Sequence, residues 1–320
     1  MSRAADRLRP GQDAIAQKGW LAAHKWLLLR RISQLGILAL FLIGPGFQHF
    51  ASWFAAGNHG ADWPMLAALI EKIQDGGGLW LVKGNLASSL TLDTLPLTDP
   101  YIFLQILAAG FVPAATAVVG AAIVVVFYLL VGGRVFCAWV CPVNLVTDAA
   151  AWMRRRLGIK ANHVPPAATR YGFLVGTFIA AAVTGTLAWE WFNPVAIAHR
   201  GLIFGMGAGG CFLLIVFIYD LLFAQRGWCG HLCPTGAFYS LLGRTALLRV
   251  SASRREACND CMDCFAVCPE PQVIRPALKK AGQESPIIRA PLCTTCGRCI
   301  DVCSQKVFRL THRFDRRSSS

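Results

Sequence analysis

Residues 258–270 read CNDCMDCFAVCPE, and residues 293–305 read CTTCGRCIDVCSQ. Each run places four cysteines at the spacing C-x2-C-x2-C-x3-C, so that three thiols lie close together and a fourth is set apart. Three closely spaced thiolates can bind three irons of a cubane cluster, while the displaced thiolate reaches the neighbouring cluster. The two runs therefore predict two [4Fe–4S] clusters bound by eight cysteines.

Because the fourth thiolate of each run reaches the cluster of the other run, the spacing assigns each cysteine to one cluster. Zinc favours two separated pairs of ligands, and disulfides are disfavoured in a reducing cytoplasm, so neither alternative suits these runs. The second run has Ser304 where proline follows in the first, which changes the local turn but removes no ligand. The predicted ligands are Cys258, Cys261, Cys264 and Cys303 for the first cluster, and Cys293, Cys296, Cys299 and Cys268 for the second.

The rest of the chain has the composition of a multi-span membrane protein. Hydrophobic residues make up 55% of the sequence and charged residues only 15%, and the net charge is +14. Such basic charge on a membrane protein usually marks cytoplasmic loops and is no evidence for nucleic-acid binding. Four apolar segments each come near the ~20 residues that cross a bilayer core of roughly 30 Å. They lie at 32–54, 112–133, 171–192 and 203–224.

The distribution of Lys and Arg predicts the orientation of these four segments. Outside them the counts are 7, 2, 6, 1 and 15 in chain order, which places both termini and the central loop in the cytoplasm. The segment 52–100 is then an outward loop, and the chain is expected in the bacterial inner membrane. We predict an all-α polytopic membrane domain over 1–250, followed by a small α+β two-cluster ferredoxin domain over 251–320.

A second cysteine pattern recurs within the membrane part. YLLVGGRVFCAWVCP (128–142) aligns without gaps on DLLFAQRGWCGHLCP (220–234), and both copies contain Arg, C-x3-C and Pro. Two pseudo-repeated helical hairpins would bring four thiols together at the cytoplasmic surface. A metal site, thiol redox chemistry, contact with a quinone head group and simple helix packing are all open roles. The four residues are Cys137, Cys141, Cys229 and Cys233.

These motifs together resemble the NapH/MauN group of membrane ferredoxin-type proteins, and the resemblance covers essentially the whole chain. The loop 83–101 and the stretch 189–205 look most like the NapH branch. The resemblance implies a redox subunit of a quinol dehydrogenase complex rather than a stand-alone enzyme. It also implies the membrane quinol pool as substrate and a NapG-like periplasmic iron–sulfur protein as partner. Electrons would then pass toward a periplasmic nitrate reductase.

Quinol oxidation also releases protons, and three residues near the outer ends of the spans are candidate acceptors: Glu190, His199 and His49. Interfacial solvation would explain them equally well. No C-x-x-C-H motif for a c-type haem is present. Two other functions fit the motifs, namely a membrane polyferredoxin that assembles or reduces copper centres and a redox-sensing docking protein. A role in methylamine oxidation would belong to the same class as nitrate reduction.

Overall fold

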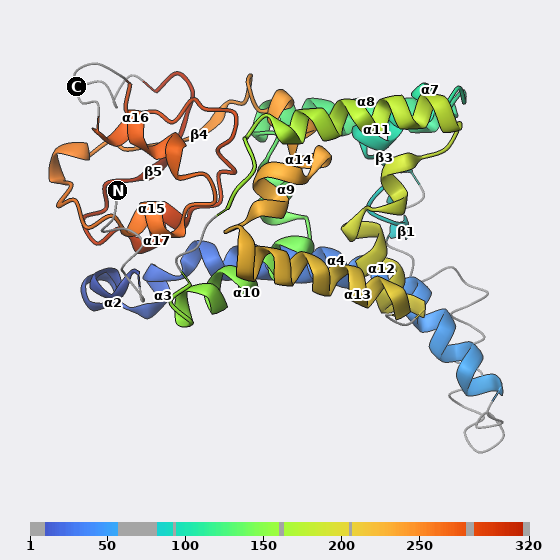
Figure 1. The fold of residues 1–320 in the computed structure, drawn as a ribbon, viewed down its shortest axis with the longest axis horizontal. Coiled ribbons are helices and arrows are strands. Elements are labelled where there is room, and N and C mark those ends of the chain that lie inside the picture. Colours follow the sequence, from blue (N-terminus) through green and yellow to red (C-terminus); the bar gives the residue numbers. More distant parts are fainter. Residues whose placement is uncertain are drawn as a thin grey trace. The chain divides into compact units, whose positions relative to one another are not determined.

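The computed structural model describes residues 10–56, 82–91, 94–159, 163–204, 207–279 and 285–315 (Figure 1). By its internal contacts the chain forms two units, which we describe separately. The cysteine-rich tail shares its unit with segments from the N-terminal 250 residues, and the predicted boundary at 250 stays a prediction. The first unit contains Met1–Gln34, Val125–Thr177 and Leu214–Ser320; the second contains Leu35–Val124 and Phe178–Leu213.

Each predicted span overlaps one apolar helix. The unit boundaries fall within these helices, which are α4 (Lys25–Ala56), α8 (Ala115–Val131), α11 (Thr169–Thr184) and α13 (Gly207–Ile218). In the part of the chain that the structure describes, none of the helices combines the length and the apolar character needed to span a bilayer. The four-span interpretation stays a prediction.

The second unit contains a small antiparallel sheet that the sequence analysis missed. Its strands are β1 (Val82–Gly84), β2 (Ser88–Thr91) and β3 (Leu95–Thr98), in that order across the sheet. The side chain of Asn85 accepts hydrogen bonds from two backbone N–H groups and so closes the first turn. The expectation of a purely α-helical membrane part is wrong for this segment, while its outward placement stays a prediction.

Helical segments complete the second unit. They are α7 (Pro100–Ala108), a 3-10 turn at Ala188–Trp191 and α12 (Pro194–Phe204). The Asp99 side chain caps α7 by accepting from the N–H of Tyr101, and proline occupies the first helical position. The buried Tyr101 ring packs edge-on against Phe178 and Trp189, so that aromatic contacts hold these segments together.

In the first unit, proline separates each cysteine pair from the helix that follows it. Pro142 precedes α10 (Val143–Arg156), and Pro234 starts α14 (Pro234–Leu242). Proline suits the first turn of a helix because an N–H there has no partner within the helix. Before the prolines lie α9 (Val135–Trp139) in the first repeat and two π-helical turns in the second, Tyr219–Phe223 and Trp228–Leu232.

The tail is the α+β unit that the sequence predicts. Strands β4 (Leu248–Ser251) and β5 (Arg309–His312) pair antiparallel, with Leu248 opposite His312. The helices are short, and two of them end directly before the last cysteine of their run. They are α15 (Asp263–Val267), α16 (Ile274–Lys279) and α17 (Arg298–Val302), with 3-10 turns at Arg255–Ala257 and Pro271–Val273. An apolar core that includes Val250, Ile274, Val307 and Phe308 lies among them.

The N-terminal helices α2 (Gln12–Lys18) and α3 (Trp20–Ala23) lie against α17 of the tail (Figure 1). Asp301 of α17 accepts hydrogen bonds from the N–H groups of Trp26 and Leu27, at 3.1 and 2.9 Å. A carboxylate at the first turn of a helix satisfies N–H groups that have no partner within the helix. The tail thus caps the start of α4, although about 270 residues separate the partners in sequence.

Gly297 is the position at which this packing is tightest. Its φ of +72° lies in the left-handed region, and a Cβ atom added there would overlap the Trp26 ring. We predict that Gly297→Ala lowers the free energy of unfolding by about 1–2 kcal/mol for the backbone and about 1–3 kcal/mol for the overlap.

Gly158→Ala is the matched control, because Gly158 has a φ of +64° and no atom near an added Cβ. Thermal unfolding of the full chain in detergent should show a larger drop in Tm for Gly297→Ala than for Gly158→Ala. Adding Trp26→Ala should recover part of the difference. Equal drops in the two glycine variants would mean that the contact with Trp26 contributes nothing.

Candidate functional site

The two cysteine runs of the tail share an unusual backbone. Asp260 and Met262, on either side of the second cysteine in the first run, have φ angles of +55° and +66°. Thr295 and Gly297 occupy the same places in the second run, with φ angles of +48° and +72°. Left-handed φ angles are uncommon for residues other than glycine, above all for a β-branched threonine. The two runs therefore share the same backbone conformation at the same positions, with strain at Asp260, Met262 and Thr295 but not at Gly297, as expected if both wrap the same kind of group.

The first three cysteines of each run line a cavity together with the last cysteine of the other run. The cavities contain about 350 and 370 Å³ of empty space, including the part open to solvent. Four soft thiol donors around one such space fit an iron–sulfur cluster. Cys258, Cys261, Cys264 and Cys303 line the first cavity; Cys268, Cys293, Cys296 and Cys299 line the second. These are the two groups that the spacing predicts.

The buried thiols around the two cavities do not ionise equally readily. Burial and the neighbouring thiols Cys261 and Cys303 together raise the pKa of Cys264 to about 12. Burial also opposes ionisation of Cys296, but the charges of Arg298 and Arg30 outweigh it and lower the pKa of that thiol. Cysteine binds iron as the thiolate. Cys296 is the exception at the second cavity, because burial raises the pKa of Cys293 to about 11 and also raises the pKa of Cys268 and Cys299.

The two C-x3-C-P pairs have the same local backbone, which supports the internal repeat. The N–H of Cys141 donates to the carbonyl oxygen of Phe136 at 3.0 Å, and the N–H of Cys233 donates to that of Trp228 at 2.9 Å. Both bonds span five residues, one more than in an α-helix, so each turn is widened where the pair ends. Such widened turns are frequent at functional sites.

The four thiols of these pairs lie in one neighbourhood, and their convergence on a single centre stays a prediction. All four are partly buried, and each lies close enough to another pair member to affect its ionisation. Burial raises the pKa of Cys233 to about 11, with Cys137 adding to the effect. Cys211, in contrast, is exposed on α13 and belongs to no thiol group. Among the described residues, no set of three or more His, Cys, Asp or Glu side chains is placed to hold a metal ion.

Trp139, between the cysteines of the first pair, connects the four thiols to the tail. Its indole Nε1 donates to the carbonyl oxygen of Thr295 at 3.3 Å, within the second cysteine run. The Trp26 ring packs edge-on against Trp139, at 6.0 Å between centroids. The four-thiol group and the second cavity are therefore neighbours within one unit.

Glu270, two residues after the last cysteine of the first run, forms a buried ion-pair network. Its Oε1 accepts from Arg134 Nη1 at 2.6 Å and from Arg170 Nη1 at 3.1 Å, and its side chain is only 3% exposed. The same arginines donate to the carbonyl oxygens of Cys229 and Gly230. One carboxylate thus joins the tail to both cysteine repeats. Burial raises its pKa, but Arg134 and Arg170 outweigh burial and hold the pKa below its ordinary value.

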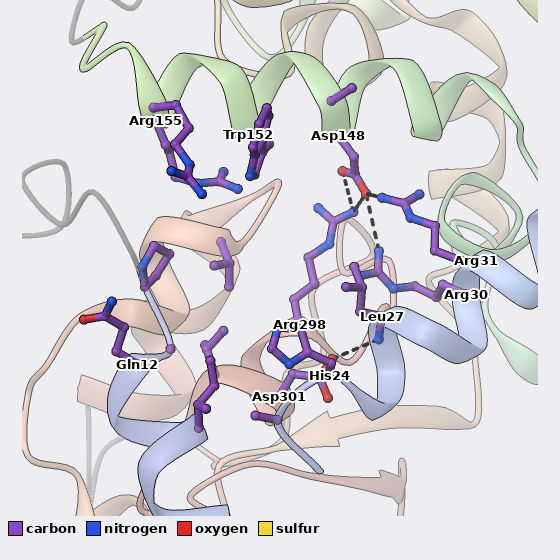
Figure 2. A pocket seen from close by; sticks show the side chains of 18 of the residues that line it. Gln12, His24, Leu27, Arg30, Arg31, Asp148, Trp152, Arg155, Arg298 and Asp301 are labelled. Carbon is purple, nitrogen blue, oxygen red and sulfur yellow. Dashed lines mark hydrogen bonds and ion pairs between the residues drawn. The ribbon is translucent and has the colours of Figure 1, made fainter. Parts of the chain in front are cut away.

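Asp148 on α10 forms a second network around one carboxylate (Figure 2). Burial opposes its ionisation, but the surrounding guanidinium groups, Arg298 foremost, bring its pKa far below the ordinary value. Arg298 comes from the second cysteine run, and Arg226 comes from the second repeat. The Oδ atoms accept from Arg298 at 2.7 and 2.8 Å, from Arg226 at 2.7 Å and from Arg31 at 2.6 Å, with Arg30 at 3.8 Å.

These networks are the part of the site that the sequence analysis missed. Arg134 and Arg226 are the arginines shared by the two repeats, and each binds a carboxylate distant in sequence. An ion pair between Arg226 and the nearby Asp220 would be the local expectation, but Asp220 instead accepts from the N–H of Trp228 at 3.0 Å. A charged residue within a repeated cysteine motif was the available signal, but its partner could not be identified from sequence.

The structure does not bring the candidate proton acceptors together. Glu190 accepts a hydrogen bond from Asn193 at 2.8 Å. His199 is 7% exposed and packs edge-on against Phe41, and burial lowers its pKa. No hydrogen bond or ion pair joins Glu190 to His199 in the described structure. The side chain of His49 lies outside the described residues.

Two family models match the chain. One, described as a 4Fe-4S binding domain, matches residues 113–160 and 204–255, which contain the two C-x3-C-P pairs. The other, described as a 4Fe-4S dicluster domain, matches residues 257–309, which contain all eight tail cysteines. No solved structure matches the chain.

Relatives with two different names match over nearly the full chain. The ferredoxin-type protein NapH of Haemophilus influenzae is 45% identical, over 95% of this chain and 96% of its own length. NapH of Escherichia coli is 44% identical over 97% of both chains. The methylamine utilization ferredoxin-type protein MauN of Paracoccus denitrificans is 49% identical, over 94% of this chain and 95% of its own. Identity therefore does not separate the two branches.

We predict that Glu270→Gln loosens the tail from the cysteine repeats. The free energy that holds the two together should fall by about 3–5 kcal/mol, because two buried arginines lose their counter-ion. Hydrogen–deuterium exchange of residues 228–236 and 268–274 measures this loosening. Glu256→Gln is the control, since the Glu256 side chain is 79% exposed and pairs with Arg255 only at 3.7 Å. Equal exchange in both variants would contradict a structural role for Glu270.

The same network predicts the pH dependence of the junction. The folded pKa of Glu270 lies below the ordinary 4.5, so the stabilisation is complete above that value and is lost as pH falls through the folded pKa. Exchange at residues 268–274 should therefore not change between pH 8 and pH 5 beyond the chemical rate, and should rise only below about pH 4.5. A rise centred near neutral pH would contradict this assignment.

Proposed function

Because the chain belongs to the family of NapH and MauN ferredoxin-type iron–sulfur proteins, we propose that it accepts electrons from quinol at the bacterial inner membrane. The observation that carries the proposal is the pair of cavities, each lined by four cysteines that come from both runs of the tail. Cys258, Cys261, Cys264 and Cys303 would hold one [4Fe–4S] cluster. Cys293, Cys296, Cys299 and Cys268 would hold the other.

The number of clusters suits the proposed substrate. A [4Fe–4S] cluster supplies one-electron transfer, so two clusters match the two electrons released when a quinol becomes a quinone. The protein's own residues exclude water and fix charge around the thiols. Arg298 and Arg30 favour the thiolate form of Cys296 at the second cavity. Glu190, His199 and His49 remain the candidate acceptors for the two protons.

The membrane arrangement is part of the same proposal. The apolar composition and the alternating Lys and Arg counts support four spans with both termini in the cytoplasm. The chain would then act within a hetero-oligomeric complex with a NapG-like periplasmic iron–sulfur protein and other components of a periplasmic nitrate reductase system. A methylamine pathway is the alternative, because the MauN relatives are as similar as the NapH relatives.

The four-thiol group supports a third metal centre. Its partly buried thiols affect one another's ionisation, and the match to a 4Fe-4S binding domain covers both pairs. Cys137, Cys141, Cys229 and Cys233 would then hold a further iron–sulfur cluster beside the second tail cavity. Copper(I) is the competing occupant, because it also prefers thiolate ligands.

The first experiment is an anaerobic titration of the purified, iron-loaded chain with a menaquinol or ubiquinol analogue, followed by EPR and visible bleaching. We expect bleaching and a reduced-cluster EPR signal in the wild-type chain. We expect both to be weakened in Cys264→Ser, because the first cluster would lack one ligand while the second keeps all four, and unchanged in Cys211→Ser. Clusters that dithionite reduces but quinol leaves oxidised would contradict direct electron transfer from quinol.

The iron content tests the third centre independently of quinol. Three [4Fe–4S] clusters would give about 12 iron atoms per chain and two would give about 8. We expect the double variant Cys137→Ser/Cys229→Ser to fall from about 12 to about 8 iron atoms while Cys211→Ser stays unchanged. About 8 iron atoms in every variant would exclude a third iron–sulfur cluster, and copper in its place would identify the competing occupant.

A further inference from the structure

A cavity of about 710 Å³ lies beside the Asp148 network, apart from both cysteine-lined cavities. Figure 2 shows it between α10, the N-terminal helices and α17, with Arg155 and Trp152 projecting from the same side of α10 as Asp148. Its volume falls within the range of ligand pockets, roughly 300–1,000 Å³. The functions proposed so far make no use of it.

The charge of this cavity is strongly positive. Asp148 and Asp301 are its only carboxylates among the described residues, and the Asp301 carboxylate already accepts from two backbone N–H groups. Six guanidinium groups thus face two carboxylates in one confined space, which is unfavourable without a further anion. The arginines are Arg30, Arg31, Arg155, Arg156, Arg226 and Arg298.

A cluster bound in the tail would balance only part of the excess positive charge of this cavity. Arg30, Arg226 and Arg298 interact with Cys296, so their charges would also serve the second cluster site. Arg155 and Arg156 have no such role, and their side chains form no ion pair or hydrogen bond with any described residue. Arg154, the third arginine at this helix end, is already engaged because it donates to the carbonyl oxygen of Leu221 at 2.7 Å.

The two free arginines are placed to hold an anion. Arg156 lies over the Trp152 ring, 5.3 Å from its centre, which limits the positions of its guanidinium group. Arg155 is partly buried, and burial together with the charge of Arg226 lowers its pKa to about 10. Within the described residues, buried nitrogen atoms of Arg30, Arg226 and Arg298 also lack a hydrogen-bond acceptor.

The lining is not wholly polar. Ile15, Leu27, Leu145 and Val302 contribute aliphatic surface between the arginines. Guanidinium groups bind phosphate through paired N–H donors, and several of them around one site suit a phosphate better than a single carboxylate. We infer that this cavity binds a phosphate ester with an apolar part, held by Arg155 and Arg156 at its phosphate.

Two sources could supply this chemistry, namely the head group of an anionic phospholipid and a water-soluble phosphate ester. The full-length chain in uncharged detergent is titrated with dioleoylphosphatidylglycerol in mixed micelles and, separately, with sn-glycerol 3-phosphate. Dioleoylphosphatidylcholine is the lipid control. Isothermal titration calorimetry at physiological salt gives Kd, and circular dichroism and iron content verify that each variant folds.

We expect one of the phosphate compounds to bind saturably. Its Kd should be at least about tenfold higher in Arg155→Gln/Arg156→Gln. The matched control Arg275→Gln/Arg289→Gln removes the same charge from exposed positions of the tail outside the cavity and should change Kd less than about twofold. Binding of the lipid alone identifies a phospholipid site, and binding of glycerol 3-phosphate identifies a soluble ligand. The inference is overturned if neither compound binds saturably, if phosphatidylcholine binds equally well, or if both double variants lose the same affinity.

Discussion

Two buried carboxylates hold the cysteine-rich tail against the cysteine repeats. Glu270 binds Arg134 of the first repeat, and Asp148 binds Arg226 of the second repeat together with Arg298 of the tail. A buried ion pair adds little net stability compared with apolar packing, but removing one partner is costly because a charge is left unpaired. Such pairs therefore select one arrangement of the segments. They place the second cavity and the four thiols side by side in a single unit.

The same arginines also determine the electrostatics of the thiols. Cys296 lies near Arg298 and Arg30, and its pKa is lowered, whereas burial raises the pKa of Cys264 in the other cavity. Positive charge near an iron–sulfur cluster favours its reduced form, which carries more negative charge. Burial also raises the pKa of Cys268, Cys293 and Cys299 at the second cavity, so the arginines single out Cys296 and not the whole cavity. The interactions that attach the tail are therefore also those that favour the thiolate form of Cys296.

The repeat extends from the sequence to the backbone. Both C-x3-C-P pairs end in a turn one residue wider than an α-helix, and proline then begins a new helix after each pair. Each pair therefore lies at a break between helices, where backbone groups and thiols can face a shared centre. Trp139 adds a hydrogen bond to the backbone of Thr295 in the second cysteine run. The equivalent residue in the second repeat is His231, so the repeats differ where the first one meets the tail.

Local spacing was sufficient to predict several features of this protein. The eight tail cysteines fall into the two groups that C-x2-C-x2-C-x3-C predicts, because three of the four thiols in each run are neighbours along the chain. The α+β character of the tail and the recurrence of the cysteine pairs are also visible in the sequence. The sheet over Val82–Thr98 was not recognised, because its strands have only three or four residues and give too short a pattern.

The tertiary structure alone decided which charges meet. Asp148 lies 150 residues from Arg298, and Glu270 lies 136 residues from Arg134, so no periodicity or spacing connects them. The local partner expected for Arg226 was Asp220, but folding brings Asp148 closer. Ion pairs depend on distance in space and on burial, whereas sequence patterns report only neighbours along one element. Cysteine spacing therefore predicted the two cysteine groups of the tail, and the fold alone determined which charges surround them.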